Sequence, residues 1–412
     1  MNAETRHFIE KNLDADIRKV ALQGCRDKAV DLPLALQQIA GWQTARRKLP
    51  TWAALDGILY PPHLNMEQCS SEQTARYKCS VCRDSVATKK SGSTLVDLTG
   101  GFGVDFSFLA PYFEHAVYVE QQEELCRLAR HNFPLLGFDS TVVCGDGTDF
   151  LHTMEHVTMI FLDPARRDAH GSRTYGISDC TPDVLTLRDE LLQKADYVML
   201  KLSPMLDWRK AVSDLGEQWV REVHIVSTEG ECKELLVLLS VKGSGLRLVC
   251  VNDGELFVAE ESETSSNQST ELANLPAFIG ISDLSVSSSD SPAYLYEPNA
   301  SIMKAGCFDE LSTRFGIQQL APNSHLFLSN RFIGDFPGRR FCIDAVSSMN
   351  KRELKEKVTP LQQANITVRN FPLSVAELRK RLKLSEGGHN YIFATTLADG
   401  HHVLLICKKA KP

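Results

Sequence analysis

The stretch LVDLTGGFGVD at residues 95–105 runs from an apolar segment, through Asp97, into a glycine-rich turn and the start of a predicted helix. Many nucleotide-binding folds begin with such a strand, turn and helix. In a dinucleotide fingerprint a third glycine lets the helix pack closely on the strand. With Gly101 and Gly103 as the first two glycines, Phe106 stands at the third position. The Gly-Lys-Ser/Thr of a P-loop is also absent, so we predict neither a dinucleotide loop nor a phosphate loop.

Around this stretch, residues 93–260 alternate between short β-branched segments and amphipathic helical segments. The predicted strands are TLVDLTG (94–100), HAVYVEQ (115–121), STVVCGD (140–146), TMIFLDPA (158–165) and DYVMLKLSP (196–204). Such alternation is typical of an α/β fold with a parallel sheet covered by helices on both faces. Three later segments complete the sheet, with an antiparallel hairpin at its end: VREVHIVST (220–228), KELLVLLSV (233–241) and LRLVCVN (246–252).

Acidic residues stand at the ends of four successive predicted strands, namely Asp97, Glu120, Asp146 and Asp163. Each one alone is a weak indication, because a solvated carboxylate at a strand end is common. Open α/β sheets, however, bind ligands at the carboxyl ends of their strands. Four such residues in order therefore predict a ligand site at this edge.

The segment DLTGGFG (97–103) resembles the first motif of class I S-adenosylmethionine-dependent methyltransferases, which have a Rossmann-like sheet. This resemblance implies S-adenosylmethionine as cofactor, with the glycine loop next to its methionine part, Glu120 on the ribose hydroxyls and Asp146 on the adenine amino group. Thr99 replaces a glycine that is common in the family. The implied cofactor-binding residues are Asp97, Thr99, Gly101, Phe102, Gly103, Glu120 and Asp146.

The fourth strand ends in Asp163-Pro164-Ala165-Arg166. Asp163 and Pro164 match the (D/N)PP(Y/F/W) motif of amino methyltransferases, but the aromatic residue is missing. The segment is closer to the DPPR of RNA uracil-C5 methyltransferases, which need a nucleophilic cysteine after strand five. Residues 201–205, KLSPM, contain no cysteine, so we predict methylation of a nitrogen.

The resemblance implies that Asp163, Pro164 and Arg166 are catalytic, with Asp163 orienting or deprotonating the amine. Arg166 or Arg167 would face a phosphate or a carboxylate, or else form a surface ion pair with Asp168 or Asp179. Tyr175 could supply the missing aromatic platform or pack under its own loop.

The C-terminal end of the chain is basic. Residues 351–412 contain twelve Lys and Arg against five Asp and Glu, although the whole chain has a net charge of −7. They belong to a predicted βαβαββ module, whose last hairpin turns at Asp399-Gly400. A basic end on an acidic body suggests a polyanionic partner, while Lys and Arg that merely solvate helix faces are the alternative.

A wider resemblance covers nearly the whole chain. The segments ALQQIAGWQTARRKLP (35–50), MEQCSSEQTARYK (66–78), LDPARR (162–167) and RNFPLSVAELRKRLKLSEGGHNYIFATT (369–396) are similar to a bacterial methyltransferase family with a C-terminal THUMP-like domain and a small ferredoxin-like segment before it. THUMP domains bind RNA in several RNA-modifying enzymes. We therefore expect tRNA or rRNA as partner, with no DNA and no membrane.

These patterns predict four parts: an N-terminal helical region (1–92), the S-adenosylmethionine-binding domain (93–260), a ferredoxin-like α+β segment (271–335) and the THUMP-like domain (336–412). Ser/Thr-rich tracts at 261–270 and 282–292 read as linkers. The charged N-terminus lacks the apolar core of a secretory signal, so we expect a cytoplasmic protein. A zinc site at Cys79 and Cys82 would need two further ligands, such as His63 and Cys69, whose spacing matches no zinc pattern, so we predict two buried or semi-exposed thiols and no metal.

Two alternatives to an RNA methyltransferase remain open. The DPAR segment also permits a protein amide or a small metabolite as substrate, and the basic C-terminus would then be incidental. The missing aromatic in the same segment permits a non-catalytic RNA-binding scaffold with a relic cofactor site.

Overall fold

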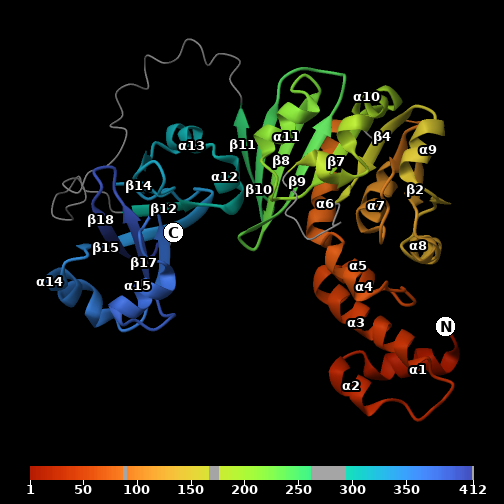
Figure 1. The fold of residues 1–412 in the computed structure, drawn as a ribbon, viewed down its shortest axis with the longest axis horizontal. Coiled ribbons are helices and arrows are strands. Elements are labelled where there is room, and N and C mark those ends of the chain that lie inside the picture. Colours follow the sequence, from red (N-terminus) through yellow and green to blue (C-terminus); the bar gives the residue numbers. More distant parts are fainter. Residues whose placement is uncertain (87–90, 167–175, 261–293, 411–412) are drawn as a thin grey trace. The chain divides into compact units, whose positions relative to one another are not determined.

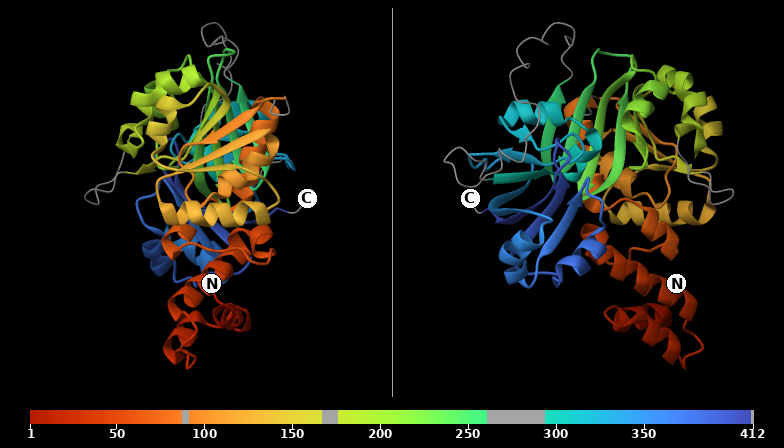
Figure 2. Two further views of the ribbon diagram at one scale, coloured as in Figure 1. Left: turned by 90° about the vertical axis from the view of Figure 1, so that its right-hand side faces the viewer. Right: turned by 60° about the vertical axis from the view of Figure 1, so that its left-hand side comes forward.

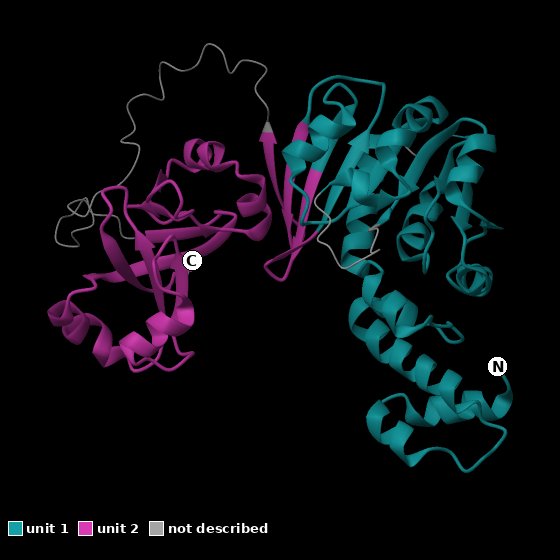
Figure 3. Ribbon diagram, in the orientation of Figure 1, with its two compact units in different colours: residues 1–223, 234–246 teal, residues 224–233, 247–412 magenta. Residues whose placement is uncertain are grey.

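The computed structural model describes residues 1–86, 91–166, 176–260 and 294–410 (Figure 1). The chain forms two compact units, coloured separately in Figure 3. Unit 1 comprises residues 1–223 and 234–246, and unit 2 comprises residues 224–233 and 247–412. Both predicted linkers, 261–270 and 282–292, lie outside the described residues. No helix in the described ranges has the length and apolar content that a membrane span requires.

Unit 1 begins with the predicted helices. They are α1 (Ala3–Asn12), α2 (Ile17–Gln23), α3 (Leu32–Lys48), α4 (Pro50–Ala53), α5 (His63–Gln68) and α6 (Glu72–Val81), and a π-helical turn, Cys82–Val86, follows. Ser71 caps α6, because its side chain accepts a hydrogen bond from the Thr74 amide. Cys79 and Cys82 are both buried free thiols, which confirms that part of the prediction.

The Rossmann-like sheet has nine strands in the order β11-β10-β8-β9-β7-β4-β1-β2-β3. Their bounds are β1 Thr94–Asp97, β2 His115–Glu120, β3 Thr141–Cys144, β4 Val157–Leu162, β7 Ala195–Leu202, β8 Val220–Thr228, β9 Glu231–Leu239, β10 Arg247–Asn252 and β11 Glu255–Glu260. The five strands from β7 to β3 are parallel, as predicted. β9 runs antiparallel to β7. The sheet ends in an antiparallel hairpin of β10 and β11, and β11 is a strand that the sequence patterns did not predict.

Helices cover both faces of this sheet, as the left view of Figure 2 shows for α6 (orange) and α10 (yellow-green). The helices that follow the strands are α7 Val104–Leu109, α8 Glu123–Leu135, α9 Gly147–Thr153, α10 Val184–Lys194 and α11 Trp208–Leu215. On one face, α6, α7 and α8 bury apolar side chains against the sheet; Phe106, Phe133 and Tyr118 lie in this core. Each fully buried aromatic side chain contributes roughly 1.5–3 kcal/mol of hydrophobic stabilisation.

Unit 2 contains a seven-stranded sheet with the order β13-β14-β12-β15-β18-β17-β16. Its elements are β12 Tyr294–Pro298, α12 Ala300–Ala305, α13 Phe308–Phe315, β13 Gln318–Gln319, β14 Phe327–Ser329, β15 Gly338–Ser348, α14 Lys351–Glu353, the π-helical turn η6 Leu354–Val358, β16 Asn365–Arg369, α15 Val375–Leu382, β17 Asn390–Thr396 and β18 His402–Lys409. The predicted βαβαββ order is present. The pairing of β12 with β15 joins the two predicted C-terminal modules into one sheet.

Candidate active site at the carboxyl ends of the strands

Four neighbouring strands end at one edge of the nine-stranded sheet. In the spatial order β2, β1, β4, β7 these ends carry Glu120, Asp97, Asp163 and Lys201. The chain reverses its direction across the sheet at β1, because β2 and β3 lie on one side of it and β4 and β7 lie on the other. Such a switch point leaves a crevice outside the strand ends, where open α/β sheets bind ligands. The structure thus brings three of the predicted acidic residues to one edge of the sheet, at this switch point.

The glycine loop is held against β2. A Cβ atom on Gly100 would lie 2.2 Å from the Tyr118 ring, and one on Gly103 would lie 2.7 Å from the Phe133 ring. Gly103 also has φ +83°, a left-handed conformation that favours glycine. Neither position can therefore hold a side chain without displacing a buried ring.

Glu120 and Tyr118 fix the middle of the same loop. The Gly101 amide donates a hydrogen bond of 2.8 Å to Glu120 Oε2, and the Tyr118 hydroxyl donates to the Gly101 carbonyl. The other Glu120 oxygen, Oε1, accepts from the Gln122 amide at 2.8 Å. The buried Glu120 carboxylate thus shapes the loop before any ligand binds.

The two phenylalanines of this region face the core. Phe106 is fully buried, and its ring packs against Tyr118 and Phe133 with centroid distances of 5.5 and 5.2 Å. Phe102 packs against Trp52 at 4.9 Å, among apolar residues of the N-terminal helices. Phe102 was predicted to bind the cofactor. Because its side chain is buried in this core, only its backbone could contact a cofactor.

Thr99 connects the first motif with the fourth. Its amide donates to Asp97 Oδ1 at 2.9 Å, and its hydroxyl oxygen accepts the Asp163 amide at 2.6 Å. Asp97 is 2% exposed. Burial raises the pKa of Asp97 well above its usual range; the Thr99 hydrogen bond offsets this only in part, and the carboxylates of Asp105 and Asp163 add to it.

Asp163 forms an ion pair with Lys201, at the end of the neighbouring strand β7. Lys201 Nζ lies 2.5 Å from Asp163 Oδ2 and 3.7 Å from Asp105 Oδ2. Burial alone would lower the pKa of Lys201, but the charges of Asp163 and Asp105 outweigh it and raise the pKa above the ordinary range. Lys201 is therefore an ammonium ion at neutral pH. Within the described residues, Asp163 Oδ1 has no hydrogen-bond partner, and the side chain is 39% exposed.

A buried ionic network continues from this pair into the interior. Lys78, on α6, is completely buried, and its Nζ lies 3.1 Å from Asp105 Oδ1 and 2.7 Å from Glu234 Oε2. Burial alone would raise the pKa of Asp105, but Lys78 and Lys201 lower it on balance. Burial raises the pKa of Glu234, whose Oε1 has no hydrogen-bond partner among the described residues. The network links the N-terminal helices to the strand ends within unit 1.

Asp146 serves as the N-cap of α9. Its Oδ1 accepts hydrogen bonds from the amides of Thr148 and Asp149, at 2.7 and 3.3 Å. A Cβ atom on the next residue, Gly147, would lie 2.1 Å from the Leu98 carbonyl oxygen, so the start of α9 packs directly against the end of β1. Asp146 is exposed, and its second oxygen remains available for a ligand.

After Pro164, which is buried, the chain enters the two-residue strand β5 (Ala165–Arg166). β5 pairs with β6 (Cys180–Thr181), so that Arg166 lies opposite Cys180 in the register. Arg167, Asp168 and Tyr175 lie outside the described residues, so their alternative roles stay predictions. Asp179 accepts a hydrogen bond from the Gly176 amide at 3.2 Å.

In unit 2, the basic residues divide into structural and exposed ones. Arg379 and Lys357 are partly buried and donate to the carbonyls of Ala364 and Val346, at 3.2 and 2.7 Å. Within the described residues, six exposed cations on α14, η6 and α15 or just after it have no ion-pair partner: Lys351, Arg352, Lys355, Lys380, Arg381 and Lys383. Leu354, Val358, Leu378 and Leu382 pack into one core, so these helices cover the same face of the sheet. We call the six cations the basic face.

Comparison with known proteins now places the chain. Over 98% of this chain and 97% of the other, it matches the crystal structure of a "putative methyltransferase" from Porphyromonas gingivalis W83, with 32% identity and a TM-score of 0.82. Residues 338–409 match a family described as THUMP domain-like. The chain belongs to the bacterial class I S-adenosylmethionine-dependent methyltransferases that have a C-terminal THUMP-like domain. The predicted family and fold class are therefore confirmed.

Other comparisons add less to the description of this methyltransferase. Residues 294–337 match a ferredoxin-like domain family. A "SAM Dependent Methyltransferase" from Agrobacterium tumefaciens matches with 17% identity and a TM-score of 0.32, over 42% of this chain and 62% of the other. A score this low does not establish a common fold, so the family assignment rests on the Porphyromonas structure. No curated protein matches the chain.

Sequence reasoning missed Lys78, Asp105 and Lys201 of this methyltransferase. Lys78 lies in a segment with helical periodicity, where a lysine is normally a surface residue, and its partner Glu234 is 156 positions away. Asp105 ends the quoted motif but was assigned no role. The available indication for Lys201 was its place at the end of an apolar strand, next to the strand that ends at Asp163.

Proposed function

We propose that this methyltransferase transfers the methyl group of S-adenosylmethionine to a nitrogen atom of a nucleotide in tRNA or rRNA. The observation that carries the RNA assignment is the basic face on the THUMP-like region. Exposed Lys and Arg without carboxylate partners are suited to phosphate contacts, which dominate the affinity for nucleic acids. We also propose the four-part division at 1–92, 93–260, 271–335 and 336–412, with catalysis in the second part.

The residues at the strand ends fit the cofactor's donor groups. S-adenosylmethionine presents an ammonium group, two ribose hydroxyls and an adenine amino group, and the crevice offers the carboxylates of Asp97, Glu120 and Asp146. Among the described residues, Asp97 has no cationic partner, so an ammonium group would satisfy it. Glu120 would accept from the ribose hydroxyls, and Asp146 from the adenine amino group. When bound, the cofactor supplies an electrophilic methyl group on a sulfonium.

The charge balance of the site also favours a cation. Four carboxyl groups, those of Asp97, Asp105, Asp163 and Glu234, stand against the two cations Lys78 and Lys201, and a bound cation would favour the ionised forms of Asp97 and Glu234, whose pKa burial raises. S-adenosylmethionine carries a net positive charge, which its product loses with the methyl group. Buried charges interact strongly when the local dielectric constant is low. The surplus of carboxylates would therefore hold the cofactor more tightly than the product.

Asp163 and Pro164 would position the methyl acceptor. Lys201 holds Asp163 Oδ2, and the Thr99 hydroxyl holds the Asp163 amide, so the side chain has a defined orientation. The other oxygen, Oδ1, can accept a hydrogen bond from an amine, and the Pro164 carbonyl can accept a second one. Aligning the nitrogen lone pair with the methyl group can supply much of the rate enhancement in a displacement of this kind.

A nitrogen acceptor fits better than the pyrimidine C5 atom. The route to C5 needs an accessible cysteine thiolate as nucleophile. Cys180, whose strand pairs with β5, is buried, and Cys144 lies at the end of β3 rather than after β7. Neither cysteine follows the fifth strand of the parallel series.

The test is methyl transfer to RNA from a strain that lacks the gene. The wild-type enzyme should transfer radiolabelled methyl groups to this RNA, and mass spectrometry of the nucleosides should identify an N-methylated base. Asp163→Ala should abolish the transfer. Replacement of Lys380, Arg381 and Lys383 by Glu should weaken RNA binding at least tenfold and reduce its salt dependence, because three phosphate contacts are lost.

The matched control replaces three exposed cations of the N-terminal helices, Arg18, Lys19 and Arg47, by Glu. It changes the net charge by the same amount as the basic-face variant. RNA binding that falls equally in the control and in the basic-face variant would remove the assignment of that face. Transfer to a protein or a small molecule, with RNA from the deletion strain unlabelled, would overturn the RNA proposal. Failure of the purified protein to bind S-adenosylmethionine in calorimetry would leave only a non-catalytic scaffold.

A further inference from the structure

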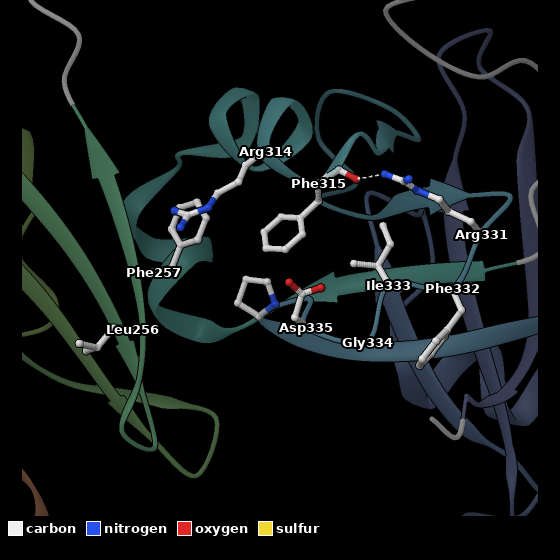
Figure 4. A pocket seen from close by; sticks show the side chains of 10 residues that line it. Leu256, Phe257, Arg314, Phe315, Arg331, Phe332, Ile333, Gly334 and Asp335 are labelled. Carbon is white, nitrogen blue, oxygen red and sulfur yellow. Dashed lines mark hydrogen bonds between the residues drawn. The ribbon is translucent and has the colours of Figure 1, made fainter.

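Unit 2 contains a pocket of about 580 Å³ that none of the motif residues of unit 1 lines (Figure 4). Three elements build it: the β10–β11 hairpin supplies Phe257, α13 supplies Arg314 and Phe315, and the loop between β14 and β15 supplies Arg331, Phe332 and Asp335. The volume lies within the range of about 300–1,000 Å³ that is typical of small-ligand sites. A single nucleotide is small enough for such a pocket.

One wall of the pocket is aromatic. The rings of Phe257 and Phe315 are nearly parallel, with an interplanar angle of 26° and centroids 6.5 Å apart. The Arg314 side chain lies beside the Phe257 ring (Figure 4), with its guanidinium 5.1 Å from the ring centroid. Phe315 is half-buried, so part of its ring can be reached from the pocket. Aromatic rings and planar guanidinium groups are the surfaces on which unpaired nucleobases stack.

The pocket also carries charges of both signs. Arg314, Arg331 and Asp335 are exposed, and none of them makes an ion pair with any residue in the described ranges. Arg314 and Arg331 each donate one hydrogen bond to a carbonyl, of Val258 and Phe315 respectively, which leaves further N–H groups for a ligand. Arginine suits phosphate oxygens, and a carboxylate suits the exocyclic amino group of a base.

Tyr296, on β12, fixes the loop between β14 and β15 that carries Arg331, Phe332 and Asp335. The Tyr296 hydroxyl accepts a hydrogen bond from the Ile333 amide at 2.8 Å and donates to the Arg331 carbonyl at 3.0 Å. The Tyr296 ring packs on Phe336, and Phe336 packs edge-on against Phe315 at 5.7 Å. A loop held at both of these positions needs little ordering when a ligand binds, which favours affinity.

We propose that this pocket binds one unpaired nucleotide of the RNA substrate. The base would stack on Phe315 and donate to Asp335, while Arg314 and Arg331 would contact the adjacent phosphates. This inference rests on the proposed function, since it names a second contact to the same RNA. Free phosphate alone fits less well, because Asp335 would repel it, and a purely apolar ligand would leave three charges unsatisfied.

The experiment measures binding of the full chain to fluorescein-labelled hexaribonucleotides of A, C or U, and to a blunt RNA duplex, by fluorescence anisotropy. The wild type should prefer the single strands. Phe315→Leu should weaken their binding about tenfold, as expected for loss of one base stack. Arg314→Gln should reduce the slope of log Kd against log salt by about one. Asp335→Ala should weaken the binding of the A and C hexamers more than that of the U hexamer, because among these three bases only A and C carry an exocyclic amino group that can donate to the carboxylate.

Arg47→Gln, which removes the same charge from α3, is the control and should bind like the wild type. Phe315→Leu could disturb packing, so Arg314→Gln and Asp335→Ala, both at exposed positions, keep the test independent of folding. Single-strand binding within twofold of wild type in all three variants would overturn the pocket assignment. If the three variants still methylate RNA, the proposed function stands and only the pocket assignment is lost. Displacement of the labelled hexamers by an acidic peptide, but not by an excess of unlabelled hexamers, would also overturn the pocket assignment and would favour a protein ligand.

Discussion

The amide of Asp163 donates a 2.6 Å hydrogen bond to the hydroxyl of Thr99, although 64 residues separate the two along the chain. Thr99 stands where the resembling methyltransferase motif commonly has glycine, and glycine has no hydroxyl to accept this bond. The threonine side chain therefore couples the loop after β1 to the segment after β4. The Thr99 hydroxyl also lies 3.4 Å from Asp97 Oδ1. One side chain therefore contacts both the Asp97 carboxylate and the backbone of Asp163.

Thr99→Val should lower methyl transfer much more than Thr99→Ser. Valine has nearly the same shape but leaves the Asp163 amide without its acceptor, which costs about 1–3 kcal/mol for a partly buried donor. Serine keeps the hydroxyl. We expect kcat to fall about tenfold or more in the valine variant and less than threefold in the serine variant, as measured by radiolabelled methyl transfer. Equal activity of the two variants would show that this bond does not position Asp163.

Asp97→Asn should raise the melting temperature at neutral pH and weaken cofactor binding. Because burial raises the pKa of Asp97, the folded chain holds more protons than the unfolded chain between the ordinary carboxyl pKa and the raised one. Stability conferred by the neutral form is therefore lost as the pH rises through this window, and asparagine removes the loss. Thermal unfolding across pH 4–8 measures the change.

The same aspartate should make cofactor affinity pH-dependent. If the cofactor's ammonium group ionises Asp97, binding releases a proton and the Kd falls as the pH rises toward the raised pKa. Calorimetry in buffers of different ionisation enthalpy should detect the proton, and Asp97→Asn should abolish its release and weaken binding about tenfold or more. Asp149→Asn, at an exposed position on α9, is the control and should leave both the proton release and the affinity unchanged.

Lys78→Met should destabilise unit 1 strongly. It removes the only cation in ion-pair contact with Glu234 among the described residues and one of two at Asp105. Breaking one partner of a buried ion pair typically costs about 3–5 kcal/mol. Adding Glu234→Gln should recover part of the lost stability, since it removes one of the two buried carboxylates that Lys78→Met leaves without this partner. Denaturant unfolding of the two single variants and the double variant measures the coupling, and strict additivity would contradict the network.

The fold could be predicted from the sequence much more completely than this network. Strands such as β1 and β4 are marked by local β-branched runs, and α8 by its apolar periodicity, so each is recognisable within a short window. The partners of Lys78 come from α7 and β9, and only the folded sheet brings them together. Helical periodicity also gives no indication that a lysine is buried, because burial depends on ion partners distant in the chain. The joining of β12 to β15 was likewise not predictable, since a pairing leaves no local pattern.

Lys201→Gln should lower kcat while leaving the protein folded. It removes the cation that holds Asp163 Oδ2, so the carboxylate loses its orientation and faces Asp105 without an intervening positive charge. Because the pKa of Lys201 is raised, its ammonium form and the stability that this form confers persist below the ordinary lysine pKa. They are lost only as the pH rises through the higher folded value. The wild-type pH–rate profile should therefore show no alkaline loss from Lys201 below about pH 10.

Met205 should take part of the role of the aromatic residue missing from the DPAR segment. It is 76% exposed, and it follows β7, whose end adjoins that of β4 and thus Asp163. A thioether side chain makes favourable contacts with aromatic rings, worth about 0.3–1.5 kcal/mol. Met205→Ala should therefore raise the KM for RNA about two- to tenfold and change kcat little, because the contact is to the base rather than to the reacting atoms.

The control for Met205 is Leu22→Ala, another strongly exposed apolar residue, at 89% exposure on α2. It removes a comparable apolar surface away from the strand ends, so steady-state methylation of RNA should not change. Both variants should unfold at the wild-type temperature, since neither residue is buried. An unchanged KM in Met205→Ala would assign base contact to another residue after β4 or β7. A fall in kcat alone would instead indicate that Met205 supports the ion pair of Lys201 and Asp163.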